Sequence, residues 1–568
     1  MEPVFLALLF SLTFVPSSTT WARSNASESK PLRVPSHRDI WRNSAGAFSG
    51  DIFLLPKRGN FFLEDKDFEP GGMEFSSVNG RMLPPHSITM HGFAWDYDLE
   101  IPLVFKDPKG TWIKPGSYSQ FATQQDIAPT LAKILDVPLA ARKSGRILSE
   151  MLQSTANKKP KVVLVFVQDQ MGDQYLKAHP KVATFYESFI KSGADFGSAR
   201  VSHVDVETSV GHVAVGTGAW PPEHGVSGND FFHSGIWKQV KAFNISMSGS
   251  KKDNLAGNPS FLFTPTLGDI WLQATEGKAI VFSQVYALRA AIGMAGHGAM
   301  FGKGFKSHAV WMDESADTSD VYLTNEQLYS LPNSHRGKSV RPYVEKLTKE
   351  TAGAWMGHEL ISKSGTINAN AVRSSPAGTE WEGDLAIAAI RELKIGQDEV
   401  TDLVYINTKA TDACGHRYGY ESDECRQVLA VTDKVSETIY NEISSITGGE
   451  FIAVLTADHG AAPLPEVSGA TRFSRQRFLK DLNTKFDARE NHVDSILAVT
   501  SSQVYLNQSE LIANGHKVSD VVQFIKKYQV PFEAPFNALA ADWIRKGKAP
   551  LQRFFEDVAS KEELAQSK

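Results

Sequence analysis

Three apolar runs of the sequence end in acidic and histidine side chains. VVLVFVQD ends at Asp169, LVYINTKATDACGH carries Asp412 and His416, and FIAVLTADHG contains Asp458 and His459. Ligands of open α/β sheets bind at the carboxyl ends of the strands, so these side chains are predicted to meet at one sheet edge. Oxygen and nitrogen ligands without thiolate suit zinc, manganese or magnesium, and the histidines favour zinc. Taken singly, each acidic residue has the alternative of being a turn former or a helix cap.

Two further features could place chemical groups at that edge. Asp412 and His416 are four residues apart, so one turn of helix would aim both at a metal. Thr208 precedes a short helix that is predicted to begin near Gly211, and a helix N-terminus stabilises an alkoxide or a phosphate. Thr208 is therefore a candidate nucleophile, with a plain N-cap as the alternative.

The elements that must position these groups are predicted from short apolar runs, which are typical of buried parallel strands. Helical patterns lie between the runs, near 384–393 and 426–446. This alternation predicts an α/β fold with a sheet covered on both faces. The predicted strands are 51–56, 162–167, 279–282, 403–406 and 451–455.

Composition and charge exclude several classes of protein. The chain has 568 residues, of which 42% are hydrophobic and 22% charged, as in folded proteins. The net charge of −5 gives no basic field that would recruit nucleic acid.

Residues 1–22 resemble a signal peptide whose apolar part, 4–15, is too short to span a bilayer, and no other run is long enough. We therefore expect a secreted or periplasmic protein without a membrane span, and the alternative for this segment is a buried N-terminal helix. Cys414 and Cys425 either pair or remain two buried thiols.

Five ordered motifs resemble the alkaline phosphatase superfamily, in the branch of threonine-nucleophile alkaline phosphatases and nucleotide pyrophosphatase/phosphodiesterases. VVLVFVQDQM is similar to the first metal motif, and ETSVGH to the T-x-x-x-H nucleophile motif, with Val210 where a proline is usual. TGAWPPEHGVSGND, ATDACGHRYG and TADHG resemble the three motifs that follow. The resemblance implies a central, mostly parallel sheet with helices on both faces and a smaller inserted cap region.

The resemblance also implies roles for individual residues. Thr208 would attack phosphorus and form a phosphothreonine, next to two Zn²⁺ ions, with Mn²⁺, Mg²⁺ or iron as alternatives. One ion would be held by Asp169, Thr208, Asp458 and His459, and the other by Asp412, His416 and His91. His212, His224 and His297 are expected to support loops or orient ligands instead.

Two residues bear on the substrate. Asn229 matches an asparagine that hydrogen-bonds a phosphate oxygen, and Arg289 matches the arginine of a K-x-R motif of monoesterases, whose lysine position holds Ala287. A monoester dianion carries more charge than a diester monoanion, so Arg289 favours monoesters and Ala287 favours diesters. We expect hydrolysis of small phosphate monoesters. Alternatives are a phosphodiesterase or nucleotide pyrophosphatase on the same site, and an inactive binding protein. The sequence does not indicate an oligomeric state.

The third histidine of the second site normally lies near the C-terminus in this family, but here it is His91, within MHGFAWDYDLEIPLVF. The flanking stretches SGDIFLLPKRGNFF and IKPGSYSQFATQQDIAPTLAKILDVP also resemble the family's closing portion, which predicts a circular permutation. A separate N-terminal domain is the alternative. The predicted organisation is a signal peptide (1–22), a permuted segment that completes the core (31–153), a linker (154–161), a catalytic core (162–530) with a cap insertion at about 235–400, and a C-terminal helical tail (531–568).

Overall fold

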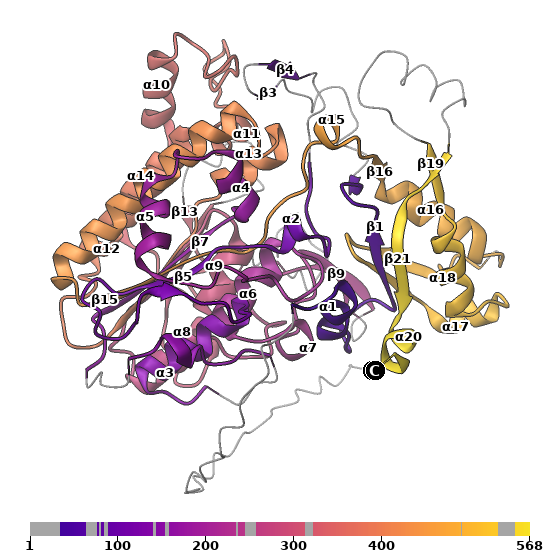
Figure 1. Cartoon of the computed structure of the whole chain (residues 1–568), viewed down its shortest axis with the longest axis horizontal. Helices are drawn as coiled ribbons and strands as arrows, with labels where there is room; N and C mark the ends of the chain where they lie inside the picture. The colour runs from indigo at the N-terminus through magenta and orange to yellow at the C-terminus, as the bar shows by residue number, and fades with distance from the viewer. Residues whose placement is uncertain are drawn as a thin grey trace, which may run out of the picture.

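The computed structural model describes residues 34–63, 76–78, 81–83, 89–139, 144–153, 158–233, 237–244, 257–312, 322–489, 491–531 and 551–567. The predicted signal peptide and residues 154–157 of the predicted linker lie outside this range. Figure 1 shows one large α/β body beside a smaller sheet that is drawn mainly in indigo and yellow, the colours of the two ends of the chain.

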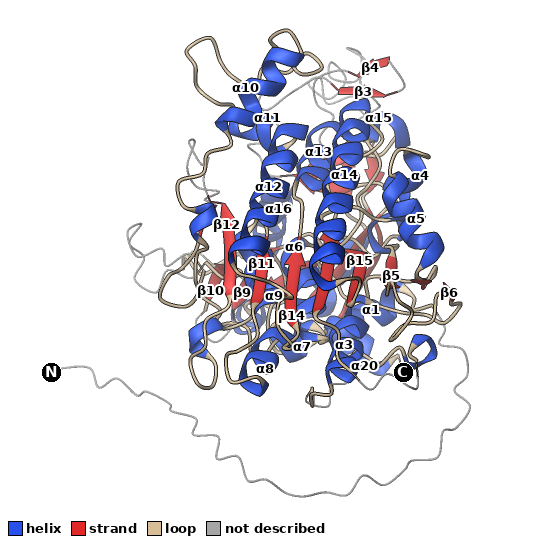
Figure 2. Cartoon of the chain, turned by 90° about the vertical axis from the view of Figure 1, so that its left-hand side faces the viewer, coloured by secondary structure: helices blue, strands red, loops and turns tan. Residues whose placement is uncertain are grey.

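A nine-stranded sheet forms the centre of the larger body. Five neighbouring strands run parallel, in the order β12, β11, β14, β7, β15. β7 and β15 are buried along their whole length, which explains their unbroken apolar sequences. These five strands are β12 (His308–Met312), β11 (Val281–Gln284), β14 (Asp402–Ile406), β7 (Val162–Gln168) and β15 (Phe451–Ala457), and Figure 2 labels all of them except β7.

The edges of this sheet are less regular. β13 (Tyr322–Leu323) pairs antiparallel with β12 at one edge. At the other edge β5 (Leu103–Lys106) pairs antiparallel with β15, and β8 (Ala194–Asp195) and β6 (Gly116–Ser117) follow it. The prediction of a mostly parallel central sheet is confirmed. Since β5 and β6 belong to this sheet, residues 103–117 are part of the large body and not of a separate N-terminal domain.

Two groups of helices cover the sheet, and the helices within each group pack against one another. The predicted helical segment 426–446 lies within α14 of the first group, and the predicted segment 384–393 follows α12 to its end at Glu392 and extends one residue beyond it. That group contains α5 (Thr184–Ser192), α12 (Pro376–Glu392) and α14 (Asp423–Thr447). The second contains α3 (Ile127–Leu135), α6 (Thr208–Thr217), α8 (Leu267–Ala274) and α9 (Leu288–Ala295).

A separate four-stranded sheet brings the two ends of the described chain together. It runs in the order β17 (Ile496–Val499), β18 (Gln503–Leu506), β1 (Ile52–Pro56), β21 (Phe555–Ser560), and all its pairs are antiparallel. The prediction that 51–56 is a parallel strand is therefore wrong, because an apolar run does not reveal strand direction. Helices α16 (Arg475–Phe486), α17 (Gln508–Ala513) and α18 (Val518–Lys526) bury their apolar faces with this sheet in a second core.

Two predicted segments differ from the structure. The tail 531–568 is not simply helical, since β20 (Leu551–Arg553) and β21 precede the short helix α20 (Lys561–Gln566). β1 is buried and needs a partner on each edge, and β21 supplies one of them. The cap expected at about 235–400 instead contributes β11, β12 and β13 to the central sheet. Within that range α10 (Arg341–Glu350) and α11 (Ala369–Arg373) lie beyond the sheet, at the same end as α13 (Ala410–Tyr418) (Figure 2).

Smaller elements connect these layers. No helix among the described residues is long and apolar enough to cross a bilayer. The remaining helices and strands are α1 (His37–Ser44), β2 (Phe61–Leu63), β3 (Ser76–Val78), β4 (Arg81–Leu83), α2 (Asp96–Leu99), α4 (Asp173–Ala178), α7 (Pro221–His224), β9 (Asp230–His233), β10 (Lys238–Lys241), α15 (Pro465–Ser468), β16 (Arg472–Ser474) and β19 (Gln529–Pro531), with short 3₁₀ turns at Gln124–Asp126, Ser149–Met151, Gly298–Met300 and Asn333–His335.

Candidate active site

The first group of predicted ligands lies at the carboxyl ends of two neighbouring strands. β7 ends opposite β15, at the pair Gln168 and Ala457, so the next residues, Asp169 and Asp458, come side by side. His459 Nε2 is 3.2 Å from Asp458 Oδ2 and 3.8 Å from Asp169 Oδ1. All three side chains are fully buried, and their ligand atoms lie within 4.8 Å of one another, close enough to hold one metal ion.

The hydrogen bonds of this group favour a bound cation. His459 Nδ1 donates to the carbonyl of Gly460 at 2.9 Å, which leaves the lone pair on Nε2. Among the described residues, neither His459 Nε2 nor Asp458 Oδ2 has a hydrogen-bond partner, although both atoms are buried. An unsatisfied buried polar atom costs about 1–3 kcal/mol. A divalent metal ion would satisfy both atoms, so the residues present fit such an ion.

The second group is assembled from α13 and from the loop before α2. His416 Nε2 is 3.2 Å from Asp412 Oδ1, as their four-residue spacing on one helix predicts. His91 Nε2 is 3.7 Å from the same oxygen. The closest metal-capable set here is His91, Asp412 and His459, so His459 lies between the two groups, and its ring stacks on His91 with centroids 3.6 Å apart. His416 contacts Asp412 but lies outside that closest set.

Backbone carbonyls orient both remaining imidazoles. His91 Nδ1 donates to the carbonyl of Val206 at 2.7 Å, and His416 Nδ1 donates to that of Thr89 at 2.9 Å. Each ring therefore presents Nε2 as a lone pair toward Asp412, the arrangement in which histidines bind metals. A disulfide between Cys414 and Cys425 joins α13 to α14 and so anchors the helix that carries Asp412. Of the two alternatives for these cysteines, the structure has the disulfide.

Thr208 is the first residue of α6, and Glu207 is the N-cap. The helix begins three residues earlier than the predicted start at Gly211. Its Gly211 packs directly on Asp458, where an added Cβ would lie 2.7 Å from the Asp458 carbonyl oxygen and 2.8 Å from its Cβ. Glycine therefore permits the close approach of α6 to the end of β15, which brings the buried Thr208 next to the first group.

Lys409 is a residue of the site that the motif reading missed. Its Nζ lies 3.0 Å from Asp169 Oδ1, 2.5 Å from Asp412 Oδ2 and 3.4 Å from Thr208 Oγ1, and only 7% of the side chain is exposed. Burial alone would lower the pKa of the Lys409 ammonium, but Asp169 and Asp412 raise it above its ordinary value. The available signal was a lone lysine at the end of a buried strand, three residues before a predicted ligand.

Asn229 and Arg289 interact with residues that flank or contact Thr208. Asn229 Oδ1 accepts hydrogen bonds from the backbone N–H (3.0 Å) and the hydroxyl (2.6 Å) of Ser209. The amide oxygen is thus used within the protein, and the amide nitrogen is the group that could donate to a substrate. The Asn229 backbone N–H donates to Glu207 at 2.7 Å. Arg289 is close enough to lower the pKa values of Glu207 and Lys409 through its charge. Ala287, at the predicted lysine position, is a buried N-cap of α9.

The other motif histidines make hydrogen bonds typical of supporting residues. His212 Nδ1 donates to the carbonyl of Thr208 at 2.8 Å, while Nε2 accepts from Asn407 at 2.8 Å. His297 binds Asp269 at 2.7 Å and the carbonyl of Leu262 at 2.6 Å, and it lies outside both metal-capable groups. Both ring nitrogens of His212 and of His297 therefore have hydrogen-bond partners, and their supporting roles stay a prediction.

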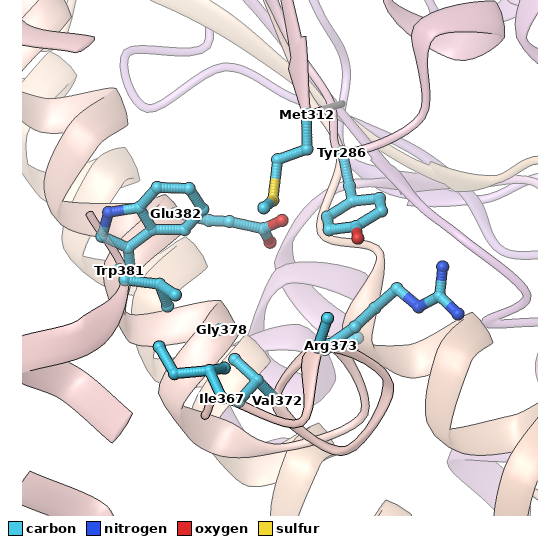
Figure 3. Close-up of a pocket in the computed structure, with 11 residues that line it drawn as sticks. Tyr286, Met312, Ile367, Val372, Arg373, Gly378, Trp381 and Glu382 are labelled. Atoms are coloured by element: carbon cyan, nitrogen blue, oxygen red, sulfur yellow. The ribbon is translucent and has the colours of Figure 1, made fainter. Parts of the chain in front are cut away.

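A cavity is lined by Ala410, the residue that follows Lys409. Tyr286, Trp381 and Glu382 are among the other side chains that line this cavity (Figure 3). Burial raises the pKa of Glu382 to about 8, and the opposing influences include the backbone N–H of Lys409. None of the predicted metal ligands lines this cavity.

The chain is similar in sequence and in fold to known alkaline phosphatases. The chain is 24% identical over 448 residues to the alkaline phosphatase PafA of Elizabethkingia meningoseptica, which covers 71% of this chain and 80% of that protein. It is 25% identical over 356 residues to the alkaline phosphatase PhoV of Synechococcus elongatus, covering 57% and 63% of the two chains. The crystal structure of wild-type PafA superposes with a TM-score of 0.52 at 22% identity, over 72% of this chain and 85% of the other, which shows a shared fold.

A family model gives the assignment. The model for type I phosphodiesterase / nucleotide pyrophosphatase matches residues 163–551, which is more than half of the chain. The matched region begins directly after the predicted linker and includes every predicted site residue except His91. The chain therefore belongs to the type I phosphodiesterase / nucleotide pyrophosphatase family, within the alkaline phosphatase superfamily.

Proposed function

We propose that this phosphoesterase hydrolyses phosphate monoesters through a covalent phosphothreonine at Thr208. The observation that carries the proposal is the position of Thr208, at the start of a helix that packs on Asp458 and within 3.4 Å of the Lys409 ammonium, which contacts both metal-capable groups. A threonine acting only as a helix cap would need no such surroundings. The alkaline phosphatase names of the relatives support the same reaction class.

The reaction has two displacements. The Thr208 Oγ1 bonds to phosphorus while the ester bond to the leaving alkoxide breaks, and the alcohol departs with the proton that Thr208 has lost. Water then attacks the phosphothreonine, releases inorganic phosphate and restores the hydroxyl. The N-terminus of α6 would stabilise negative charge on Oγ1, and we expect the Asn229 amide and the Arg289 guanidinium to bind non-bridging oxygens.

The metal ions proposed for this site are zinc. Asp169, Asp458, His459 and Thr208 would hold one ion, and Asp412, His416 and His91 the other. Bound zinc would lower the pKa of a coordinated hydroxyl and stabilise the attacking and leaving oxygens. The chain's own contribution is to fix each imidazole by a backbone hydrogen bond and to exclude water around the carboxylates.

The decisive experiment compares wild type with Thr208→Ala on an aryl phosphate monoester and the matching diester, with zinc present. We expect wild type to prefer the monoester and the variant to lose at least about 10³-fold in kcat. Intact mass after acid quenching should show a phosphate adduct on wild type only. Thr217→Ala is the matched control, since Thr217 lies in the same helix and its hydroxyl donates to the carbonyl of Val213 and accepts from the N–H of Ala219. Undiminished activity of Thr208→Ala would exclude Thr208 as the nucleophile.

Hydrolysis of diesters is the second candidate function. Buried Ala287 provides no charge where monoesterases of this branch carry a lysine. If wild type prefers the diester and Thr208→Ala still loses activity, the same site serves phosphodiesters.

Two further proposals concern the chain as a whole. We infer that residues 31–153 are the family's C-terminal portion moved to the front, joined by a linker at 154–161, because they supply His91 and β5 while the family match starts at residue 163. We also infer export to an oxidising compartment, secreted or periplasmic, which the Cys414–Cys425 disulfide supports. Enzyme activity in the extracellular or periplasmic fraction of the producing cells tests the export.

A further inference from the structure

Lys409 places one positive charge between the two metal-capable groups. Its ammonium contacts Asp169 of the first group and Asp412 of the second, and it is also within 3.4 Å of the Thr208 hydroxyl oxygen. Among the described residues, it is the ammonium that reaches both groups and the proposed nucleophile at once.

The surroundings of Lys409 hold this ammonium in place. The residue is the N-cap of α13, so its backbone is fixed between the end of β14 and the helix that carries Asp412. Glu382 lies behind it, close to its backbone N–H. The side chain is almost entirely buried and held by two carboxylates, unlike a solvated surface lysine. The charge is therefore preorganised, and little rearrangement is needed when a substrate binds.

The distance between Lys409 Nζ and Thr208 Oγ1 indicates which atoms the ammonium would contact during the reaction. When phosphorus is bonded to Oγ1, its non-bridging oxygens lie within hydrogen-bond reach of a donor placed this close to the nucleophile. Arg289 lies on α9, close enough that the two cations influence each other's electrostatics. Two cations near one phosphoryl group suit a dianion better than a monoanion.

We propose that Lys409 binds a non-bridging phosphoryl oxygen together with Arg289 and so determines the preference for monoesters, in place of the cation that Ala287 does not provide. This inference rests on the proposed function, since it assumes that phosphorus is transferred to Thr208. It makes Lys409 a specificity-determining residue. The competing explanation is that Lys409 only neutralises Asp169 and Asp412 and keeps the metal ligands apart.

The test compares wild type with Lys409→Met, which keeps an unbranched side chain one atom shorter than lysine and removes its charge. Lys106→Met is the matched control, because Lys106 lies on β5 and its ammonium bonds to Ser192, outside the site. For each protein we would measure the bound zinc by mass spectrometry, kcat/KM for an aryl phosphate monoester and the matching diester, and the Kd of inorganic phosphate by calorimetry. Lys409→Gln, which retains polar contacts to the carboxylates, carries the test if the methionine variant does not fold.

The proposal expects a selective loss at full zinc content. For Lys409→Met, kcat/KM for the monoester should fall about 10²-fold to 10³-fold. The value for the diester should fall less than about 10-fold, and phosphate should bind at least about 10-fold more weakly. Lys106→Met should match wild type in all three measurements.

Three outcomes would overturn the proposal. They are an equal loss for both esters, a loss of zinc with an unchanged ester ratio once zinc is restored, and unchanged phosphate binding. Failure of the proposed function gives a different result, in which wild type hydrolyses neither ester or Thr208→Ala remains active. The phosphate measurement still tests Lys409 in that case, because it does not depend on turnover.

Discussion

The two metal-capable groups are built in different ways. Asp169, Asp458 and His459 follow two neighbouring parallel strands, and all three side chains are fully buried. The other group combines Asp412 and His416 of one helix with His91 from a loop far away in sequence, and 28% of the His416 side chain is exposed. Strand register alone fixes the first group, whereas the second depends on a helix, a disulfide and a long-range contact. We therefore expect the second group to release its metal more easily.

The largest effect should come from breaking the first group. Asp458→Asn removes the charge of an oxygen that is buried and without a hydrogen-bond partner in the described chain, so the first metal should be lost. We expect kcat to fall by at least about 10³-fold, because Thr208 loses its activating ion. Bound metal and kcat, measured on the same sample, check this. A variant that keeps two metals per chain would contradict the assignment of Asp458 as a ligand.

A smaller effect is expected from the second group. His416→Ala should weaken binding of one metal about 10-fold to 10²-fold and leave the other bound, because His416 is the most exposed of the predicted histidine ligands. Titration with zinc should therefore restore much of the lost activity. His335→Ala is a suitable control, since its imidazole bonds to Gln284 away from both groups. Equal loss of both metals in His416→Ala would show that the groups are not independent.

Much of this arrangement could be predicted from the sequence. The runs that became β7, β14 and β15 carry both the apolar pattern and the terminal ligands, so strand position and site position came from one signal. Lys409 was missed because a lysine near a strand end is normally read as solvent-exposed, and only the tertiary structure buries it between Asp169 and Asp412.

Strand direction and partners were harder to predict. The run at 51–56 is apolar because β1 lies between β18 and β21, but the sequence does not say which segments pair with it or in which direction. The sequence predicts an insertion at about 235–400, although β11, β12 and β13 within that range belong to the main sheet.

The disulfide tests how the second group is held. Replacing Cys414 and Cys425 with serine opens a link between residues separated by 11 positions, and we expect the free energy of unfolding to fall by about 2–3 kcal/mol. Because α13 would then be less firmly attached to α14, zinc affinity at the second group should fall while the first group keeps its metal. Urea unfolding and zinc titration measure the two effects separately. Equal weakening at both groups would mean that the disulfide supports the whole site.

The smallest predicted effect concerns Asp557, which lies outside both metal-capable groups and therefore serves as a reference. Asp557 of β21 is partly buried, which opposes its ionisation, but hydrogen bonds from His37 (2.7 Å) and Arg38 (2.7 and 2.8 Å) hold its pKa below the ordinary value. A lowered pKa in the folded state gives stability that is complete above the unfolded pKa of about 4 and is lost as the pH falls below it.

Asp557→Asn should therefore lower stability at pH 7 by about 1 kcal/mol, since its partners are partly exposed, and the difference from wild type should shrink below about pH 4. Thermal unfolding at a series of pH values measures the difference. Activity and metal content should be unchanged. A stability difference that grows at low pH would contradict the assigned sign.

The pairing of β5 with β15 also sets the order in which the enzyme can become active. Leu103 pairs with Thr456, so the ribosome delivers one strand of this pair long before the other. Contacts between segments so far apart in sequence form slowly and late. Until β15 has been made, β5 can pair with the short strand β8 but is not joined to the parallel strands of the sheet, and Asp458 and His459 do not yet exist. A nascent chain that ends before β15 therefore lacks two of the predicted metal ligands, and the complete centre can assemble only once Asp458 and His459 have been synthesised.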